Sequence, residues 1–120
     1  AARTELAKAI AKLKPLSGTA WIANRINGTA VTGNAPTLTI KGDRAFGSGG
    51  CNRYTGQVTL GNKDALQFGP AASTRMACPG NAEQQEAAFF NALQNVTGYH
   101  LNSGSLILLD AQYNKVLEFQ

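Results

Sequence analysis

The sequence predicts an α+β domain, a mostly antiparallel curved sheet or open β-barrel of about eight strands with one packed helix over residues 81–97. Two observations lead to this prediction. Short segments in which apolar and polar residues alternate, separated by glycine, asparagine and proline, fill most of the chain after Leu16. One longer segment with helical spacing interrupts them, and segregation of strands and helix along the chain is typical of α+β folds.

Length and composition fit one globular domain. The chain has 120 residues, of which 43% are apolar and 15% charged, so a single core is expected and disorder is not. The longest apolar run, "LILLD", is far shorter than the roughly 20 residues that span a membrane. Because the chain begins with Ala1 rather than Met, we interpret it as a processed or trimmed product whose missing N-terminal sequence could carry a membrane tether.

The positive charge is concentrated at the N-terminus. The net charge is +4, and residues 1–14 contribute +3 of it through four basic residues and one acidic residue. The remaining residues are nearly neutral, with their charges scattered singly. Nucleic-acid binding requires clustered lysine and arginine on one face, so the sequence argues against a nucleic-acid partner.

Residues 1–15 predict a short amphipathic helix or linker. In "TELAKAIAKLKP", Thr4 can cap the helix and Pro15 ends it, while the apolar residues that share one face are Leu6, Ile10 and Leu13. A helix this short is marginal alone, so we place the domain boundary at Pro15 and the folded domain at residues 16–120.

Five strands are predicted before the helix. Leu38 and Ile40 share a face in "PTLTIKGD", and Leu66 and Phe68 do so in "ALQFGP". The other three segments are "TAWIANRI", "RAFGSGG" and "YTGQVTL".

The helix and the last three strands follow. In "NAEQQEAAFFNALQNV", Asn81 and Gln84 have the spacing of a capping box, Gly98 is placed to end the helix, and the apolar stripe consists of Phe89, Phe90, Leu93 and Val96. The segments "YHLNS", "SLILLD" and "KVLEF" alternate as strands do. "NSGS" predicts a hairpin, and "AQYN" predicts a looser turn that lacks the usual glycine, although Asn114 tolerates a left-handed conformation.

The two cysteines admit three interpretations. Two cysteines in a small glycine-rich domain favour a disulfide if the compartment is oxidising. A Cys51–Cys78 bridge would close a loop of about 28 residues and stabilise the fold by roughly 3.6 kcal/mol. Two buried free thiols are the next alternative. A nucleophilic Cys51 activated by His100, the only histidine, is the third and has the weakest support.

Four glycines surround the first cysteine in "GSGGCNRYTG". They predict a sharply bent strand that lies against a neighbour with no room for side chains. A phosphate-binding loop is disfavoured, because no G-x-x-x-x-G-K-[ST] pattern occurs and the segment leads into a strand.

Other polar groups give no pattern of a metal or catalytic site. Cys51, Cys78 and His100 lack zinc-ligand spacing, so we expect no metal and no cofactor. Acidic residues stand singly at predicted strand ends or on exposed positions. Ser73, Thr74 and Arg75 could bind an anion or satisfy the backbone of a bend, and the second interpretation is preferred.

The assembled motifs resemble the META domain family, which includes the heat-shock lipoprotein HslJ and is also called DUF306. The resemblance runs from about Leu16 to Phe119, and its segments are "GTAWIANRING", "GSGGCNRYTGQVTL", "LQFGPAASTRMACPG", "EQQEAAFFNALQNVTGYHLNSGSLILLD" and "VLEF". "GGCNRYTG" followed by "STRMACP" is highly specific. The segment "DAQYNK" departs from the pattern, because the family usually has a glycine turn there.

The resemblance implies a small α+β domain of the bacterial cell envelope, in the periplasm or outer membrane, often tethered as a lipoprotein. The family is linked to heat stress and to resistance against novobiocin, with no established catalytic activity. The matched residues then form the framework of the fold: Gly50, Cys51, Asn52, Tyr54, Gly56, Ser73, Thr74, Arg75, Met76 and Cys78. An envelope location also favours the disulfide.

Three functions are therefore compared. The first is a monomeric, non-enzymatic envelope-stress domain that binds a protein partner or a small ligand. The second is a thiol-dependent enzyme or redox protein that uses Cys51 with His100 or Cys78. The third is a protease inhibitor that presents the loop "RINGTAVTGNAP".

Overall fold

The computed structural model describes residues 16–120, so the predicted N-terminal helix over residues 1–15 lies outside the described part of the chain. The described residues form ten strands and one helix: β1 (Trp21–Ile26), β2 (Thr29–Ala30), β3 (Thr37–Lys41), β4 (Arg44–Ser48), β5 (Arg53–Leu60), β6 (Leu66–Phe68), β7 (Ala72–Ser73), α2 (Ala82–Gln94), β8 (Gly98–Asn102), β9 (Ser105–Leu109) and β10 (Lys115–Phe119).

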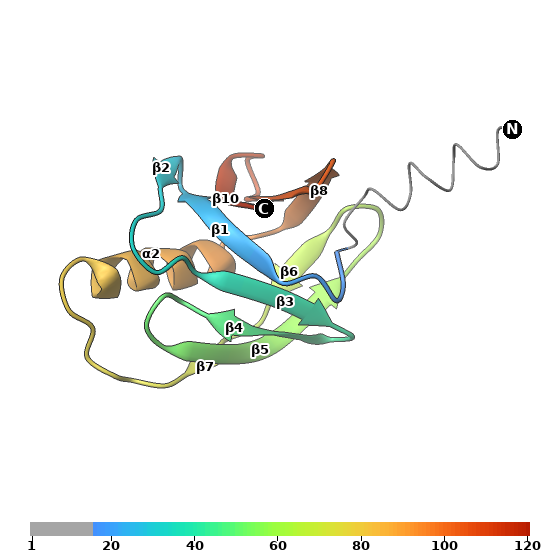
Figure 1. Cartoon of the computed structure of the whole chain (residues 1–120). Coiled ribbons are helices and arrows are strands. Elements are labelled where there is room, and N and C mark those ends of the chain that lie inside the picture. The colour runs from blue at the N-terminus through green and yellow to red at the C-terminus, as the bar shows by residue number, and fades with distance from the viewer. Residues whose placement is uncertain (1–15) are drawn as a thin grey trace, which may run out of the picture.

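All paired strands are antiparallel and lie in the order β6-β5-β4-β3-β1-β10-β9-β8, with β2 added to β1 and β7 to β5. The sheet is strongly curved and does not close (Figure 1), although its ends approach at an isolated bridge between Ala65 and Gly98. The predicted fold class, an α+β domain with a curved antiparallel sheet, is confirmed. The sequence analysis missed β2 and β7, because two residues are too few to show an alternating pattern.

Two bulges in neighbouring strands contribute to the curvature. The register shifts between Ala23 and Arg25 in β1, and between Lys115 and Leu117 in its partner β10. Because a bulge breaks the alternation of side chains, both Val116 and Leu117 are buried in β10. Because bulges increase the local bend and twist of a strand, these two favour curvature in the middle of the sheet.

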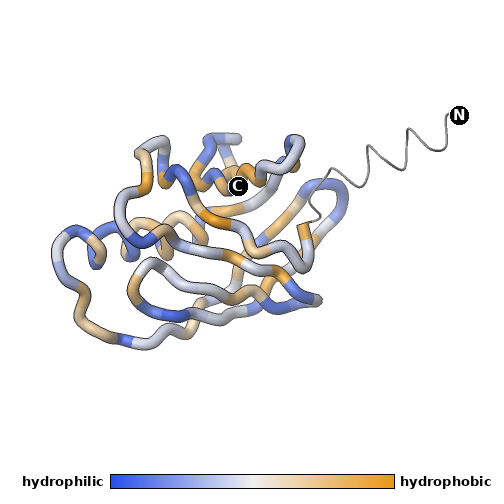
Figure 2. Tube along the Cα trace, in the orientation of Figure 1, coloured by the Kyte–Doolittle hydropathy of each residue, from blue (hydrophilic) through white to orange (hydrophobic). Residues whose placement is uncertain are grey.

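Helix α2 lies across one side of the curved sheet and contacts β1, β6 and β10 (Figure 1). Phe89 is fully buried, and its ring centroid lies 5.7 Å from that of Tyr54 and 6.3 Å from that of Phe119. Apolar residues occur in short stretches along the strands and on the helix, and hydrophilic residues gather at turns (Figure 2). The helix therefore covers one continuous core.

The predicted ends of the helix need correction. Helix α2 ends at Gln94 rather than at residue 97, because Thr97 donates its N–H to the carbonyl of Leu109 (2.8 Å) and Gly98 begins β8. Asn81 is the N-cap residue, but its side chain makes no capping hydrogen bond. The prediction of a capping box is therefore wrong. Asn81 has helical backbone angles (φ −83°, ψ −2°), whereas a residue that caps through its side chain typically has extended ones.

The two predicted turns between the last strands differ in outcome. Ser103 and Gly104 both have positive φ, as a two-residue hairpin between β8 and β9 requires. In the turn between β9 and β10 the left-handed residue is Tyr113 (φ 64°), not Asn114. The side chain of Asp110 accepts hydrogen bonds from Gln112 and Asn114 and fixes the turn in that shape.

Candidate functional site

The residues of the two cysteine motifs meet at one end of helix α2. A disulfide joins Cys51, in the loop between β4 and β5, to Cys78, in the segment before the helix, with 6.1 Å between their Cα atoms. Over the described residues 16–120 no cysteine is free. The bridge ties the loop after β4 to the start of α2, across the part of the chain that contains β5, β6 and β7.

Asn52 connects the two motifs through its side chain. It is only 6% exposed, and its Oδ1 accepts hydrogen bonds from the backbone N–H of Met76 (2.7 Å) and the hydroxyl of Thr74 (3.0 Å). Its Nδ2 donates to the carbonyl of Met76 (3.3 Å) and to Oε1 of Glu86 (2.7 Å). Every polar atom of this side chain therefore has a partner, as a buried amide requires.

Glu86, on helix α2, is the buried carboxylate at the centre of this cluster. It is 6% exposed, and its Oε2 accepts the backbone N–H groups of Cys51 (2.9 Å) and Asn52 (2.6 Å). Charge-assisted hydrogen bonds of this kind are about twice as strong as neutral ones. Glu86 thus takes the place of a sheet partner for two consecutive N–H groups that follow β4.

The sequence analysis did not identify Glu86, although a signal was present. Glu86 precedes Phe89, Phe90 and Leu93 by three, four and seven residues, so it lies on the apolar face of the helix. A charged residue on an apolar stripe needs partners in the interior. Here the partners come from the cysteine loop.

Close packing explains the glycines around Cys51. A Cβ atom on Gly49 would lie 2.6 Å from Cγ of Glu86, and one on Gly50 would lie 2.9 Å from the carbonyl of Asn34. A Cβ atom on Gly47 would collide with the backbone of Thr37. Each position lies against a neighbour that leaves no room for a side chain.

Tyr54 and three of the four matched residues after β6 have structural contacts. The hydroxyl of Tyr54 donates to the carbonyl of Thr37 (2.6 Å), and burial raises the pKa of this phenol. Ser73 pairs with Tyr54 in the sheet, and the hydroxyl of Thr74 accepts the N–H of Arg53 (3.2 Å). The Thr74 hydroxyl therefore accepts a hydrogen bond from the backbone, as the preferred interpretation of this segment predicted. The side chains of Arg75 and Met76 are exposed. Met76 therefore contacts Asn52 through its backbone and not through its side chain.

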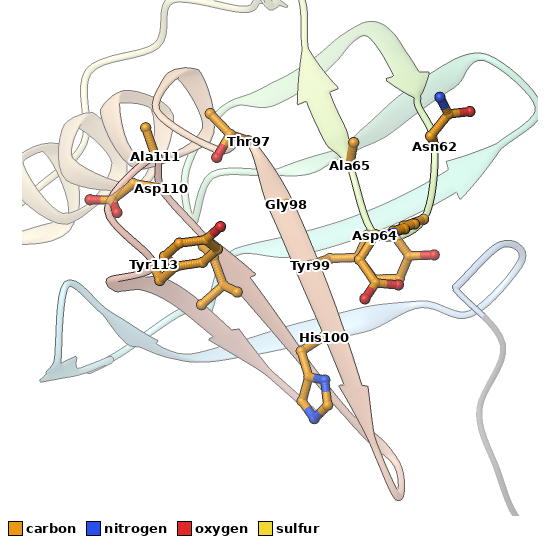
Figure 3. A pocket seen from close by; sticks show the side chains of 12 residues that line it. Asn62, Asp64, Ala65, Thr97, Gly98, Tyr99, His100, Asp110, Ala111 and Tyr113 are labelled. Atoms are coloured by element: carbon orange, nitrogen blue, oxygen red, sulfur yellow. The ribbon is translucent and has the colours of Figure 1, made fainter.

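The structure does not bring His100 to the cysteines. His100 lies on β8 and lines a separate hollow of about 470 Å³, whereas Cys51 lies beside Cys78 at the start of α2. Figure 3 shows this hollow, with Tyr113 and Asp110 on one side of β8 and Tyr99 and Asp64 on the other. No motif of the sequence analysis pointed to it.

A protein-family comparison identifies the chain. The family model of the META domain matches residues 14–120. The chain belongs to the META domain family. This confirms the resemblance found in the sequence, and the match covers the cysteine motifs, the helix and the closing strands.

The META domain of this chain resembles two solved structures. One is described as the NMR structure of the protein from Burkholderia xenovorans; it has 30% sequence identity and a TM-score of 0.68, over 88% of this chain and 82% of that one. The other, described only as an NMR structure, has 25% identity and a TM-score of 0.66, over 84% and 86% of the two chains. The comparison with curated proteins gives no match.

Residues 16–120 of this META domain contain neither a membrane-spanning helix nor a cluster of metal-binding side chains. No helix among them is long and apolar enough to cross a membrane. No group of three histidine, cysteine, aspartate or glutamate side chains in the same range could hold a metal ion.

Proposed function

We propose that this META domain is a monomeric, non-enzymatic, stress-associated domain of the bacterial cell envelope, located in the periplasm or at the outer membrane, that binds a protein partner or a small ligand. The observation that carries the proposal is that the residues of the two cysteine motifs bond to one another and to the backbone. Cys51 is bonded to Cys78, and Asn52 and Glu86 direct their polar atoms at each other and at the backbone. These groups stabilise the fold and offer no nucleophile to a substrate.

The disulfide also supports the envelope location. Disulfides persist in oxidising compartments such as the bacterial periplasm and are rare in the cytosol, where thiols are kept reduced. The links of the META family to heat stress and novobiocin resistance fit a domain whose fold is held by a covalent bridge. A role in either response is part of the proposal.

The arrangement disfavours the thiol-enzyme hypothesis. A catalytic cysteine needs a free sulfur with a base within hydrogen-bond reach, and here Cys51 is bonded to Cys78 while His100 lines another hollow. The protease-inhibitor hypothesis stays a prediction. Its loop is held to helix α2 by two hydrogen bonds of 2.9 Å between Thr32 and Gln85.

The test measures, in one experiment, the cellular location of the protein and the oxidation state of its two cysteines. The full-length gene is expressed in its natural host, the cells are quenched in acid, and thiols are labelled with a maleimide–polyethylene glycol before and after reduction. We expect the protein in the envelope fraction, with Cys51 and Cys78 unlabelled before reduction and both labelled after it. A Cys51→Ala variant provides the control, since it leaves Cys78 without its partner and free to be labelled before reduction. A cytoplasmic protein with two free thiols would refute the envelope assignment.

A further inference from the structure

The hollow of Figure 3 is a surface depression at the place where the two ends of the sheet approach. Gly98 lies in its floor, opposite Leu109 in the sheet. One rim is the loop after β5, whose residues Asn62, Lys63 and Asp64 are exposed; the other is the turn after β9, which carries Tyr113. Because Gly98 has no side chain, the floor stays open between the two rims.

Tyr113 is the most exposed of the large hydrophobic side chains among the described residues. It is 84% exposed, and its backbone has a φ of 64°, in the left-handed region that favours glycine. Lys63, on the opposite rim, has a φ of 57°. Non-glycine residues held in this conformation are concentrated at functional sites. Two of the four such residues described in the structure line this single hollow.

The turn that presents Tyr113 is fixed by hydrogen bonds. Oδ1 of Asp110 accepts the N–H groups of Gln112 and Asn114, both at 2.9 Å, and Oδ2 accepts the side-chain amide of Asn114 at 3.1 Å. The N–H of Tyr113 donates to the carbonyl of Asp110 at 3.0 Å. The phenol ring is therefore attached to a backbone that is ordered before any ligand binds, and preorganisation of this kind lowers the cost of binding.

We propose that this hollow binds a neutral oligosaccharide, with one sugar ring against the ring of Tyr113. A pyranose has a face of C–H groups that packs on an aromatic ring and an edge of hydroxyls that needs donors and acceptors. In this proposal the ring face comes from Tyr113, and the hydroxyl partners come from the carboxylate of Asp64 and the imidazole of His100, two polar side chains among the residues that line the hollow. This assignment rests on the proposed function of the domain as a binding module.

The openness and charge of the hollow favour a sugar over other ligands. Its rim residues are exposed, so a bound molecule keeps much of its surface in water, which suits a hydroxyl-rich ring and not an apolar ligand. The charged side chains that line the hollow are those of Lys63, Asp64 and Asp110, a formal net charge of −1. A negative site disfavours acidic sugars and phosphates.

The test is a titration of the whole 120-residue chain, labelled with ¹⁵N, followed by the chemical shifts of its backbone amides. The probes are cellotetraose, maltotetraose and the tetramer of N-acetylglucosamine. At least one of them is expected to shift the amides of Gly98, His100 and Tyr113 in a saturable way, while the amides around Cys51 stay unchanged. Saturable binding at the hollow supports the proposal.

Variants separate binding from folding. Tyr113→Gly suits the left-handed backbone and keeps the fold, but it is expected to weaken sugar binding about tenfold or more. Tyr113→Phe keeps the ring and retains most of the affinity. Met76→Ala, which changes a side chain that is 61% exposed away from the hollow, is the matched control and leaves binding unchanged.

Three outcomes overturn the assignment: no shift with any of the three sugars, equal affinity of the wild-type chain and Tyr113→Gly, or binding of tetramethylammonium without binding of a sugar. The last outcome would identify a cation site, since aromatic rings beside carboxylates also bind quaternary ammonium groups. None of these outcomes bears on location or thiol state. Failure here is thus distinguishable from failure of the proposed envelope function.

Discussion

Replacement of Glu86 by alanine tests the buried cluster directly. The substitution removes the acceptor of three hydrogen bonds, donated by Cys51 N (2.9 Å), Asn52 N (2.6 Å) and Asn52 Nδ2 (2.7 Å). Asn52 Nδ2 keeps the carbonyl of Met76 as a partner, but the two backbone N–H groups lose the acceptor they have in the wild-type chain. A buried donor without a partner costs about 1–3 kcal/mol.

The expected destabilisation is therefore about 2–6 kcal/mol, a large part of the roughly 5–15 kcal/mol that stabilises a typical domain. At about 4–8 °C per kcal/mol for a domain near this size, the melting temperature falls by about 10 °C or more. Glu86→Gln keeps one carbonyl oxygen but points an amide at the amide of Asn52. It should cost less than the alanine variant, about 1–3 kcal/mol.

Urea unfolding measures these changes, with the fluorescence of Trp21 as the probe, since it is the only tryptophan and is fully buried. The matched control is Glu83→Ala, an exposed glutamate one turn earlier on the same helix, which should change stability by less than about 0.5 kcal/mol. If Glu86→Ala unfolds within about 0.5 kcal/mol of the wild-type chain, the carboxylate does not stabilise the cysteine loop and the argument fails.

Three further predictions follow from the same structure. Cys51→Ser combined with Cys78→Ser lowers the free energy of unfolding by roughly 3.6 kcal/mol in urea, and an unchanged midpoint would contradict the role of the bridge. Because burial raises the pKa of Tyr54 above its ordinary value near 10, stability holds below about pH 10 and falls as the pH rises further; Tyr54→Phe should flatten this alkaline loss in a series of melting curves. The backbone N–H of Asn114 lowers the pKa of Asp110, so its contribution is present above about pH 4 and is lost as the pH falls below that value; Asp110→Asn should remove this acid dependence.

Local patterns predicted the elements that have strong local signals. Leu38 and Ile40 are fully buried on one face of β3, as alternation required, and the segment from Ser103 to Gly104 forms the predicted hairpin turn. Strand order was not predictable in the same way. β10 lies between β1 and β9. Pairing between segments distant in sequence depends on which strand faces are buried together, and the alternation of residues along one strand does not specify this.

The buried cluster and the hollow show two further limits of sequence analysis. The position of Glu86 on the apolar face of the helix was a signal, but its partners were not predictable, because two of them are backbone N–H groups of a loop 34–35 residues away and backbone donors have no sequence signature. Tyr113 was missed because Asn114 is the residue of this turn that tolerates the left-handed conformation best, whereas the structure has Tyr113 in it. The hydrogen bonds of Asp110 decided the turn instead.

The pairing of β1 with β10 has a consequence for how the chain reaches its native state. Ala23 faces Phe119, so strands near the two ends of the domain are neighbours in the middle of the sheet. A ribosome or a translocation channel releases the N-terminal strands first, and they must wait for the last residues before the centre of the sheet can form. Domains with such distant pairings fold slowly and expose unpaired strands meanwhile. A newly made chain therefore passes through a period in which aggregation competes with folding.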